Sequence, residues 1–366
     1  MKLGARIFKT GIAIVLAMLI ASLLPKSAGI PTVAGIGAIV AMQPSVYRSY
    51  KTIKEQFQGN LIGAILSVSM VSLFGDSIII MGATVIVLIA LLFQLKLQHV
   101  ATLATVTALI IMGQGGETGN FYASAFYRFV LVMIGVFSAF TVNVAFFPPK
   151  YETKLYYNSM NIASDIFIWI KLVINDTTEF YHVKEDTKSI KERLKNLEQL
   201  FNYYKEERPF FRKNWPELNR KKIIFKQVVT TTKSAYDVLR RMHRYQHDLH
   251  NMSTDLRLQI KFELDDLMTS YDQIMLSIAQ KARHDFENFQ APVDIPQKIE
   301  LMEAFKNEMV LNTETSEYSI SNVMQIISAI EEFSYDLAHL DRLVMSYFQF
   351  HTDDSNIEIE EEDLDL

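Results

Sequence analysis

Long uncharged stretches alternate with short charged ones over the first 150 residues of the chain. Six windows contain no Asp, Glu, Lys or Arg, and they lie at residues 10–25, 27–47, 56–75, 77–95, 97–116 and 129–149. Only thirteen charged residues interrupt the first 150 positions, and most of them fall between windows. Because a bilayer core of about 30 Å is crossed by about 20 apolar residues in a helix, the pattern predicts a bundle of six transmembrane helices.

Two of these windows have short cores rich in small or hydroxylated residues, at about 31–42 and 99–112. The two cores match at an offset of 70 positions, with Ala34, Ala38 and Met42 aligned with Ala104, Ala108 and Met112. Short or broken segments at matching places in two halves are typical of transporters with inverted repeats. The match favours a 3+3 inverted repeat, and the alternative is a chance alignment of alanine-rich helices.

The basic residues of the first 150 positions gather on every second loop. One side of the predicted bundle receives Lys2, Arg6, Lys9, Arg48, Lys51, Lys54, Lys96, Lys150 and Lys154, and the other side receives Lys26 and at most Arg128. Cytoplasmic loops carry the excess of Lys and Arg. We therefore expect a multi-pass protein of the bacterial plasma membrane with both termini in the cytoplasm.

After residue 150 the hydrophobic positions take the spacing of soluble helices. Apolar residues recur every three or four positions over about 151–174, 190–204, 224–256, 260–278 and 326–347, and no strand pattern appears. Such seams are typical of long antiparallel helices packed as a bundle. The sequence thus predicts an all-α protein with a transmembrane domain at 1–150, a cytoplasmic helical bundle at 151–350 and an acidic disordered tail at 351–366. Polar residues at 251–255 suit a turn, but the seam runs through them, so one very long helix is the other reading.

Charge separates the same regions. Residues 1–150 carry a balance of +7, whereas residues 151–366 carry −12. The tail from 353 to 366 holds eight acidic residues and no basic one. An acidic second half argues against a nucleic-acid partner, and the first half implies the lipid bilayer as the partner.

Polar side chains at membrane depth are costly and usually face a cavity or a partner. Arg128, near the outer start of the sixth window, has a guanidinium that can bind a carboxylate through two hydrogen bonds. Gln43 and Gln114 end the two short cores, and Asn60 lies in the third window. These four residues are the candidate substrate-binding residues. For Arg128 two other roles stay open, namely an ion pair with Glu117 or an extended side chain that reaches the outer headgroups.

Two further sets of residues follow from their chemistry and spacing. His99 titrates near neutral pH, so His99 and Glu117 are the candidate residues for proton coupling, with an interfacial histidine as the alternative. Gly59 and Gly63 have the G-x-x-x-G spacing that lets two helices approach closely in lipid. We expect them to serve packing within the fold.

Several classes of chemistry find no support in the chain. Cysteine is absent, which excludes disulfides, thiol catalysis and cysteine-ligated metals. No P-loop, Rossmann glycine pattern or nucleophile elbow is present. His243, His247 and His250 share one helix face, but neighbouring arginines favour a solvated basic face over a metal site. We predict no enzyme, no metal and no cofactor.

Three motifs carry a resemblance to a known family: residues 9–13 (KTGIA), 34–45 (AGIGAIVAMQPS) and 58–64 (QGNLIGA). With these motifs the chain resembles the aromatic acid exporter family, and more closely its bacterial six-span branch with a helical C-terminal domain, within the fusaric acid resistance group. The resemblance implies efflux of small aromatic carboxylates. Because larger relatives carry two such membrane units, it also implies a homodimer.

Two functions remain open from the sequence. The first is an exporter or pore for small organic anions. The alternative is a membrane-anchored scaffold whose helical domain and acidic tail bind a protein partner.

Overall fold

The chain forms two compact groups of helices in a computed structural model. The structure describes residues 5–25, 30–113, 121–145, 150–175, 180–207, 215–279, 301–307, 309, 318–350, 357 and 359, and every regular element within them is helical. The all-helical class predicted from the sequence is therefore confirmed. Contacts divide the chain into a first unit, Met1–Pro149, and a second unit, Lys150–Leu366.

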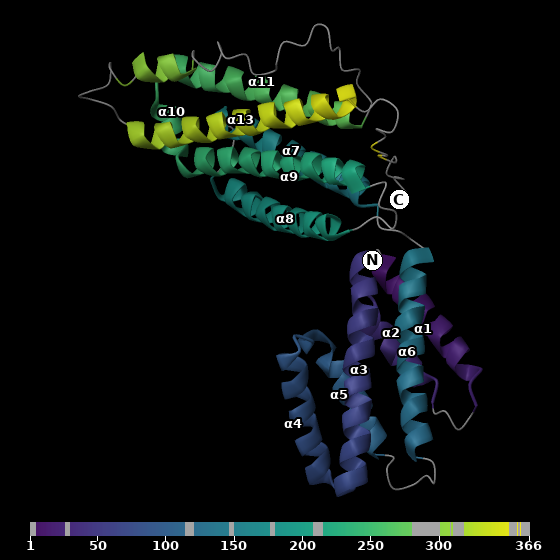
Figure 1. Ribbon diagram of the computed structural model, residues 1–366. Coiled ribbons are helices and arrows are strands. Elements are labelled where there is room, and N and C mark those ends of the chain that lie inside the picture. The colour runs from purple at the N-terminus through teal and green to yellow at the C-terminus, as the bar shows by residue number, and fades with distance from the viewer. Residues whose placement is uncertain are drawn as a thin grey trace. The chain divides into compact units, whose positions relative to one another are not determined.

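The first unit contains six apolar α-helices (Figure 1). They are α1 (Ala5–Ser22), α2 (Thr32–Ala41), α3 (Val46–Phe74), α4 (Ile78–Gln94), α5 (Ala101–Gly113) and α6 (Phe121–Ala145), with a short 3-10 turn, η2 (Gln98–Val100), before α5. Two of them, α3 and α6, are long and apolar enough to cross a membrane. The other four apolar helices are shorter. Short cores were expected for α2 and α5, whereas α1 and α4 are shorter than the full spans expected from the sequence.

Local sequence accounts for the boundaries of α2 and α3. Pro31 stands directly before α2, where its missing N–H would find no partner within the helix. The side chain of Ser45 caps α3 by accepting a hydrogen bond of 3.1 Å from the Arg48 N–H. Gly75 ends α3 with a φ of 84°, a left-handed conformation that glycine adopts without strain.

The helices of the first unit pack in a paired pattern. In one group α2 contacts both α1 and α6, and α1 also contacts α6. In the other group α5 contacts both α3 and α4, and α3 also contacts α4. Helices α3 and α6 join the two groups through their mutual contact.

The second unit is a bundle of long helices. Its main elements are α7 (Tyr151–Ile174), α8 (Phe180–Glu206), α9 (Trp215–Arg244), α10 (Gln246–Asn251), α11 (Thr254–Ile278) and α13 (Ile320–Phe350). Helix α9 contacts α7, α8 and α13, and α11 closes the bundle against α7 and α13. Fully buried side chains such as Leu155, Phe225 and Phe333 form its core.

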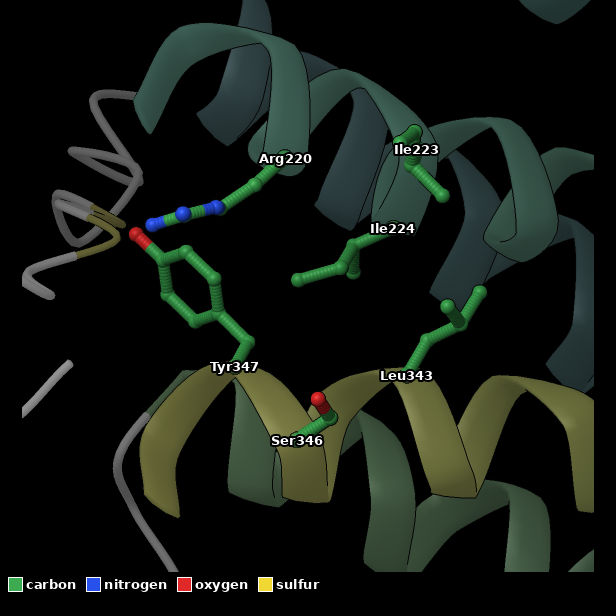
Figure 2. Close-up of a pocket in the computed structure, with 6 residues that line it drawn as sticks. All are labelled: Arg220, Ile223, Ile224, Leu343, Ser346 and Tyr347. Atoms are coloured by element: carbon green, nitrogen blue, oxygen red, sulfur yellow. The ribbon is translucent and has the colours of Figure 1, made fainter. Parts of the chain in front are cut away.

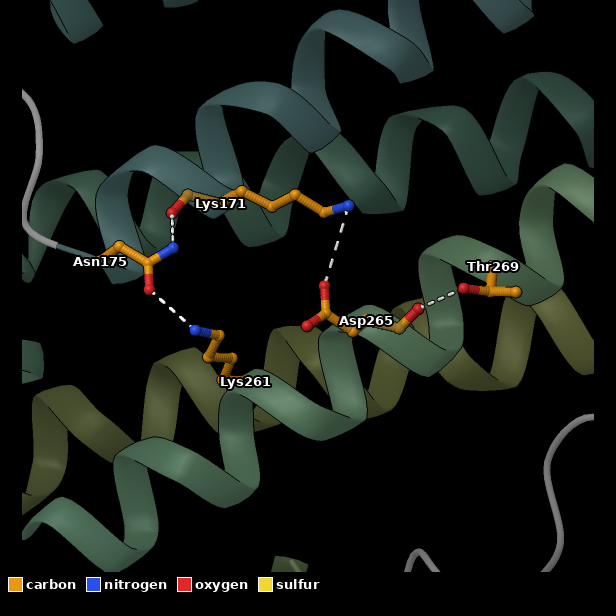
Figure 3. A network of polar contacts seen from close by, with 5 residues as sticks. All are labelled: Lys171, Asn175, Lys261, Asp265 and Thr269. Atoms are coloured by element: carbon orange, nitrogen blue, oxygen red, sulfur yellow. Dashed lines mark hydrogen bonds and ion pairs between the residues drawn. The ribbon is translucent and has the colours of Figure 1, made fainter.

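Polar contacts add detail to the surface of this bundle. Figure 3 shows Lys171 and Asn175 of α7 facing Lys261 and Asp265 of α11. Lys261 Nζ donates to Asn175 Oδ1 over 3.0 Å, and Lys171 Nζ lies 3.9 Å from Asp265 Oδ1. Exposed pairs of this kind contribute little to stability, so the bundle depends on its apolar core.

The structure decides between a turn and one very long helix over residues 224–256. The helix is interrupted at Tyr245, between α9 and α10, and again at Met252 and Ser253 before α11. Ser253 caps α11 by accepting from the Leu256 N–H. The polar segment is therefore a turn, because its serine satisfies the first turn of the next helix.

Two residues of the predicted acidic tail pack on the second unit. Ile357 is buried within its hydrophobic core, and Ile359 packs against the same core. Residues 351–356, 358 and 360–366 lie outside the described residues.

Candidate functional site

Helix α3 buries its polar side and exposes its apolar side. Its buried residues are Ser49, Thr52, Gln56, Gly59, Asn60, Gly63 and Ser67. On the other side Ile65 is 59% exposed and Leu73 is 74% exposed. In water this arrangement would be unfavourable, because apolar surface is driven out of water. In lipid it is the expected arrangement, since polar side chains there turn toward the bundle interior.

A cluster of amide and hydroxyl groups lies between the middle of α3 and α5. Asn60 Nδ2 donates to the backbone carbonyl and to the side-chain oxygen of Gln56, both over 2.9 Å. Thr107 Oγ1 of α5 lies 3.0 Å from Asn60 Oδ1 and 2.8 Å from the Leu103 carbonyl. Asn60 is completely buried, so this predicted site residue sits in a polar network inside the unit.

A second buried cluster ties three helices at the end of the unit where α3 begins. Asn143 of α6 donates through Nδ2 to Ser49 Oγ over 2.8 Å and to the carbonyls of Gln43 and Ser45, both over 3.2 Å. Lys9 Nζ of α1 donates to Asn143 Oδ1 over 3.2 Å. Lys9 is only 9% exposed. Gln43 thus enters this cluster through its backbone carbonyl.

The sequence offers Asn143 as a further polar candidate at membrane depth, whereas Lys9 was not assigned to the site. The available signal was an asparagine inside the sixth uncharged window and a lysine at the edge of the first. It did not show that the two meet, because 134 positions separate them in the chain.

Arg128 is the most deeply buried arginine among the described residues, with 6% of its surface exposed. No hydrogen bond or ion pair to it occurs among those residues. It lies fifteen residues before Asn143 on the same helix, which corresponds to about 22 Å along the axis. The structure therefore does not bring Arg128 together with Gln43. Gln114 and Glu117 lie outside the described residues.

The coupling candidate His99 contacts a carboxylate of α3. His99 Nε2 forms a short contact with Glu55 Oε2 of α3, and Lys51 Nζ lies 3.6 Å from Glu55 Oε1. Glu55 lies in a basic segment of the sequence and was not predicted to be a site residue. Its contact joins α3 to the turn before α5.

Glycines set the closest helix contacts of the first unit. An added Cβ on Gly59 would lie 2.6 Å from Val100 Cγ2, and one on Gly63 would lie 3.2 Å from the Ala104 carbonyl oxygen. Both glycines therefore face the α5 side of the fold. Between α2 and α6 the approach is closer, since a Cβ on Gly135 would lie 2.1 Å from the Ala34 carbonyl oxygen.

Elsewhere the described residues include no group of three or more His, Asp or Glu side chains arranged to hold a metal ion. The three histidines of the basic face have separate surroundings. His250 Nε2 lies 3.0 Å from the Val173 carbonyl, and the His247 ring lies 3.1 Å from Asn251 Nδ2.

An all-helical first unit whose helix α3 buries polar side chains and exposes apolar ones is typical of a helical membrane protein. Residues 1–146 match the model of aromatic acid exporter family member 1. The UPF0421 protein YgaE of Bacillus subtilis is 37% identical over 362 residues, which cover 99% of this chain and 100% of that protein. The chain belongs to the UPF0421 family, and its first 146 residues are similar to the aromatic acid exporter family. The resemblance seen in the sequence motifs is thereby confirmed.

Other relatives match over part of their length. A UPF0421 protein of Oceanobacillus iheyensis is 29% identical over 164 residues, covering 45% of this chain and 46% of the relative. One of Staphylococcus epidermidis is 28% identical over 230 residues, covering 60% and 67%. The names of these relatives state no substrate. The match of residues 1–146 to an exporter family indicates a membrane transporter.

Proposed function

We propose that the protein exports small aromatic carboxylates from the bacterial cytoplasm through a six-helix membrane unit. The observation that carries this proposal is the buried polar row on α3, which includes Ser49, Thr52, Gln56 and Asn60. Polar groups at membrane depth commonly mark a substrate pathway. The family supplies the substrate class.

A 3+3 inverted repeat is part of the proposal, and the glycine contacts support it. Gly63 of α3 approaches the Ala104 carbonyl, and Gly135 of α6 approaches the Ala34 carbonyl. Ala34 and Ala104 are the residues that align at an offset of 70 positions. The helix contacts have the same symmetry. If α1 is replaced by α4, α2 by α5 and α3 by α6, and the reverse, every pair of helices in contact corresponds to another pair in contact. Inverted repeats of this kind place the transport site at their interface.

The proposed orientation puts both termini and the second unit in the cytoplasm. Lys51 and Lys54 lie in the first turns of α3, and Lys96 lies in the turn after α4. The Lys9–Asn143 cluster lies at the same end of the unit, where α3 begins. This distribution follows the positive-inside rule. Since the chain has no cysteine, single cysteines introduced beside these lysines and labelled in intact cells would test the orientation.

Arg128 is the proposed carboxylate-binding residue near the outer end. A buried guanidinium is expensive unless an anion or several acceptors accompany it. A carboxylate substrate would supply both through two parallel hydrogen bonds. Neutral polar groups along the path of the substrate to Arg128 would come from Asn60, Gln56 and Thr107.

Transport of benzoate and cinnamate out of proteoliposomes tests this function. We expect Arg128→Gln and Asn60→Ala to lower the flux about tenfold or more, since each removes a polar group from the pathway. Ser69→Ala is the matched control, because Ser69 lies on the exposed side of the same helix. Absence of carboxylate flux in the wild-type protein would refute the exporter, and equal flux in Arg128→Gln would remove Arg128 from it.

A homodimer is also part of the proposal. On α1 an apolar groove is lined by Ile7, Phe8, Gly11, Ile12, Val15, Leu16 and Leu19. A Cβ added to Gly11 would meet nothing within 4 Å, so the α1 of a second copy can approach this point closely. Disulfide crosslinking of Gly11→Cys tests the contact, with Gly82→Cys as the control.

A further inference from the structure

A small pocket opens between the first turns of α9 and the last turns of α13. It is lined by Arg220, Ile223, Ile224, Leu343, Ser346 and Tyr347, and its volume is about 150 Å³. Figure 2 shows the three aliphatic side chains on one side of the space and the polar ends of Arg220 and Tyr347 together on the other. The pocket is therefore amphipathic, with an apolar body and one polar end.

The volume limits the size of a ligand. A cavity of about 150 Å³ with aliphatic walls is large enough to hold a benzene ring. Ile224 and Tyr347 are buried, whereas Ile223 is 52% exposed at the pocket. A ring seated here would cover the exposed side chain of Ile223 and remove apolar surface from water.

The polar end is suited to one negative charge. The guanidinium of Arg220 lies beside the hydroxyl of Tyr347 in Figure 2. A guanidinium presents paired N–H donors that match a carboxylate. Burial, followed by the nearby carboxylates of Glu217 and Glu152, raises the pKa of Tyr347. The hydroxyl therefore stays protonated and can donate to an anion.

Among the residues that the structure describes, the acidic side chains of Glu217 and Glu152 act on Tyr347, and both have partners outside the pocket. Lys221 Nζ lies 2.8 Å from Glu217 Oε1, and the Tyr204 hydroxyl donates to Glu152 Oε1 over 2.7 Å. Their charges are thus partly compensated by neighbours outside the pocket, which lowers the repulsion that an incoming carboxylate would meet.

We propose that this pocket in the second unit binds a small aromatic monocarboxylate, with the ring between Ile223, Ile224 and Leu343 and the carboxylate on Arg220 and Tyr347. The identity of the acid rests on the proposed export function, whereas the site is separate from the buried polar row of α3. The second unit would thereby respond to the concentration of the acid that the first unit exports.

Fluorine NMR with 4-fluorobenzoate and the full-length protein in detergent tests the site, with protein-free micelles as the blank. We expect the dissociation constant to rise about tenfold or more in Arg220→Gln, because a charged hydrogen bond is lost. Ile223→Glu places a like charge at an exposed position of the pocket and is expected to abolish binding there. Arg244→Gln removes an exposed arginine from the same helix and should leave binding unchanged. 4-Fluorobenzylamine, which carries the opposite charge, should not compete.

The outcomes separate this site from export. Equal affinity in the wild type, Arg220→Gln and Ile223→Glu would overturn the pocket, as would the absence of wild-type binding. Loss of binding in both variants, with unchanged affinity in Arg244→Gln, would support it. If proteoliposomes showed no flux while that pattern held, the export proposal would fail and the pocket would stand.

Discussion

Both units are built from helices, but α3 of the first unit and α7 of the second bury opposite kinds of side chain. In α3 of the first unit the buried side is Ser49, Thr52, Gln56 and Asn60, and the exposed side is apolar. In α7 of the second unit the buried side includes Ile162, Ile166 and Ile170. The comparison teaches that helix periodicity identifies two sides, whereas the surrounding solvent decides which side turns inward.

The means of cohesion differ as well. The second unit buries large side chains such as Tyr271 and Phe333. The first unit relies on backbone contact at Gly37 and Gly135 and on amide networks at Asn60 and Asn143. Without a hydrophobic drive between helices in lipid, close packing and polar contacts must hold them.

The largest expected effect comes from Gly135→Ala. Its new Cβ would overlap the Ala34 carbonyl oxygen, so α2 and α6 must separate. We expect loss of monodisperse protein in detergent, measured by size-exclusion chromatography. Gly82→Ala is the control, since a Cβ there meets nothing within 4 Å. Normal behaviour of Gly135→Ala would show that the backbone contact does not hold the first unit together.

Next in size is Phe333→Ala in the second unit. Phe333 is fully buried, so its removal should lower the free energy of unfolding by about 3–5 kcal/mol. Thermal unfolding of the full-length protein measures the loss. Phe262→Ala, at a position 68% exposed, should change stability by less than about 1 kcal/mol. Similar losses in both variants would contradict an apolar core in this unit.

A smaller effect sharpens the contrast between the two exteriors. Ile65→Lys puts a charge on the exposed apolar side of α3 and should cost about 2–3 kcal/mol at membrane depth. Phe262→Lys puts the same charge on the exposed surface of α11 and should cost less than about 0.5 kcal/mol. Membrane-inserted yield and thermal stability measure both. Equal tolerance of the two lysines would mean that the exposed side of α3 does not face lipid.

The smallest expected effect depends on pH. Burial raises the pKa of Asp341 in α13 to about 6, and the charge of Arg342 partly opposes this. The folded protein therefore binds this proton more tightly than the unfolded chain does. The contribution of Asp341 to the free energy of unfolding is therefore most favourable at low pH, where the carboxyl is protonated. It declines as the pH rises from about 4 to about 6.

The variant Asp341→Asn tests that dependence. It should be more stable than the wild type at pH 7, by about 1–3 kcal/mol, and no more stable at pH 4. Melting temperatures at the two values measure the difference. A gain of the same size at both values would trace the effect to packing and not to ionisation.

Much of the fold could be predicted because it follows from local patterns. The helix that starts at Tyr151 follows two prolines, and the short helices α2 and α5 occupy the cores rich in small residues. Gly59 and Gly63 were assigned to packing by their spacing alone. Each of these inferences needs only neighbours a few positions away.

The site could be predicted only in part, because its contacts join distant positions. The sequence singled out Asn60 but could not show that Thr107 meets it. The sequence singled out His99 but could not show that Glu55 lies beside it. Periodicity tells which side of a helix is buried, but not which helix covers that side.

The contact between α2 and α6 has a consequence for synthesis. Gly37 cannot form its contact with α6 until Val132 and Gly135 have been synthesised, about 100 residues later. At about 5–20 residues per second, that interval is about 5–20 s. During it α1 and α2 lack their principal neighbour. Insertases or chaperones in the membrane therefore have this time interval in which to cover α1 and α2. In a chain that ends before α6, the two helices would stay uncovered and accessible to quality-control proteases.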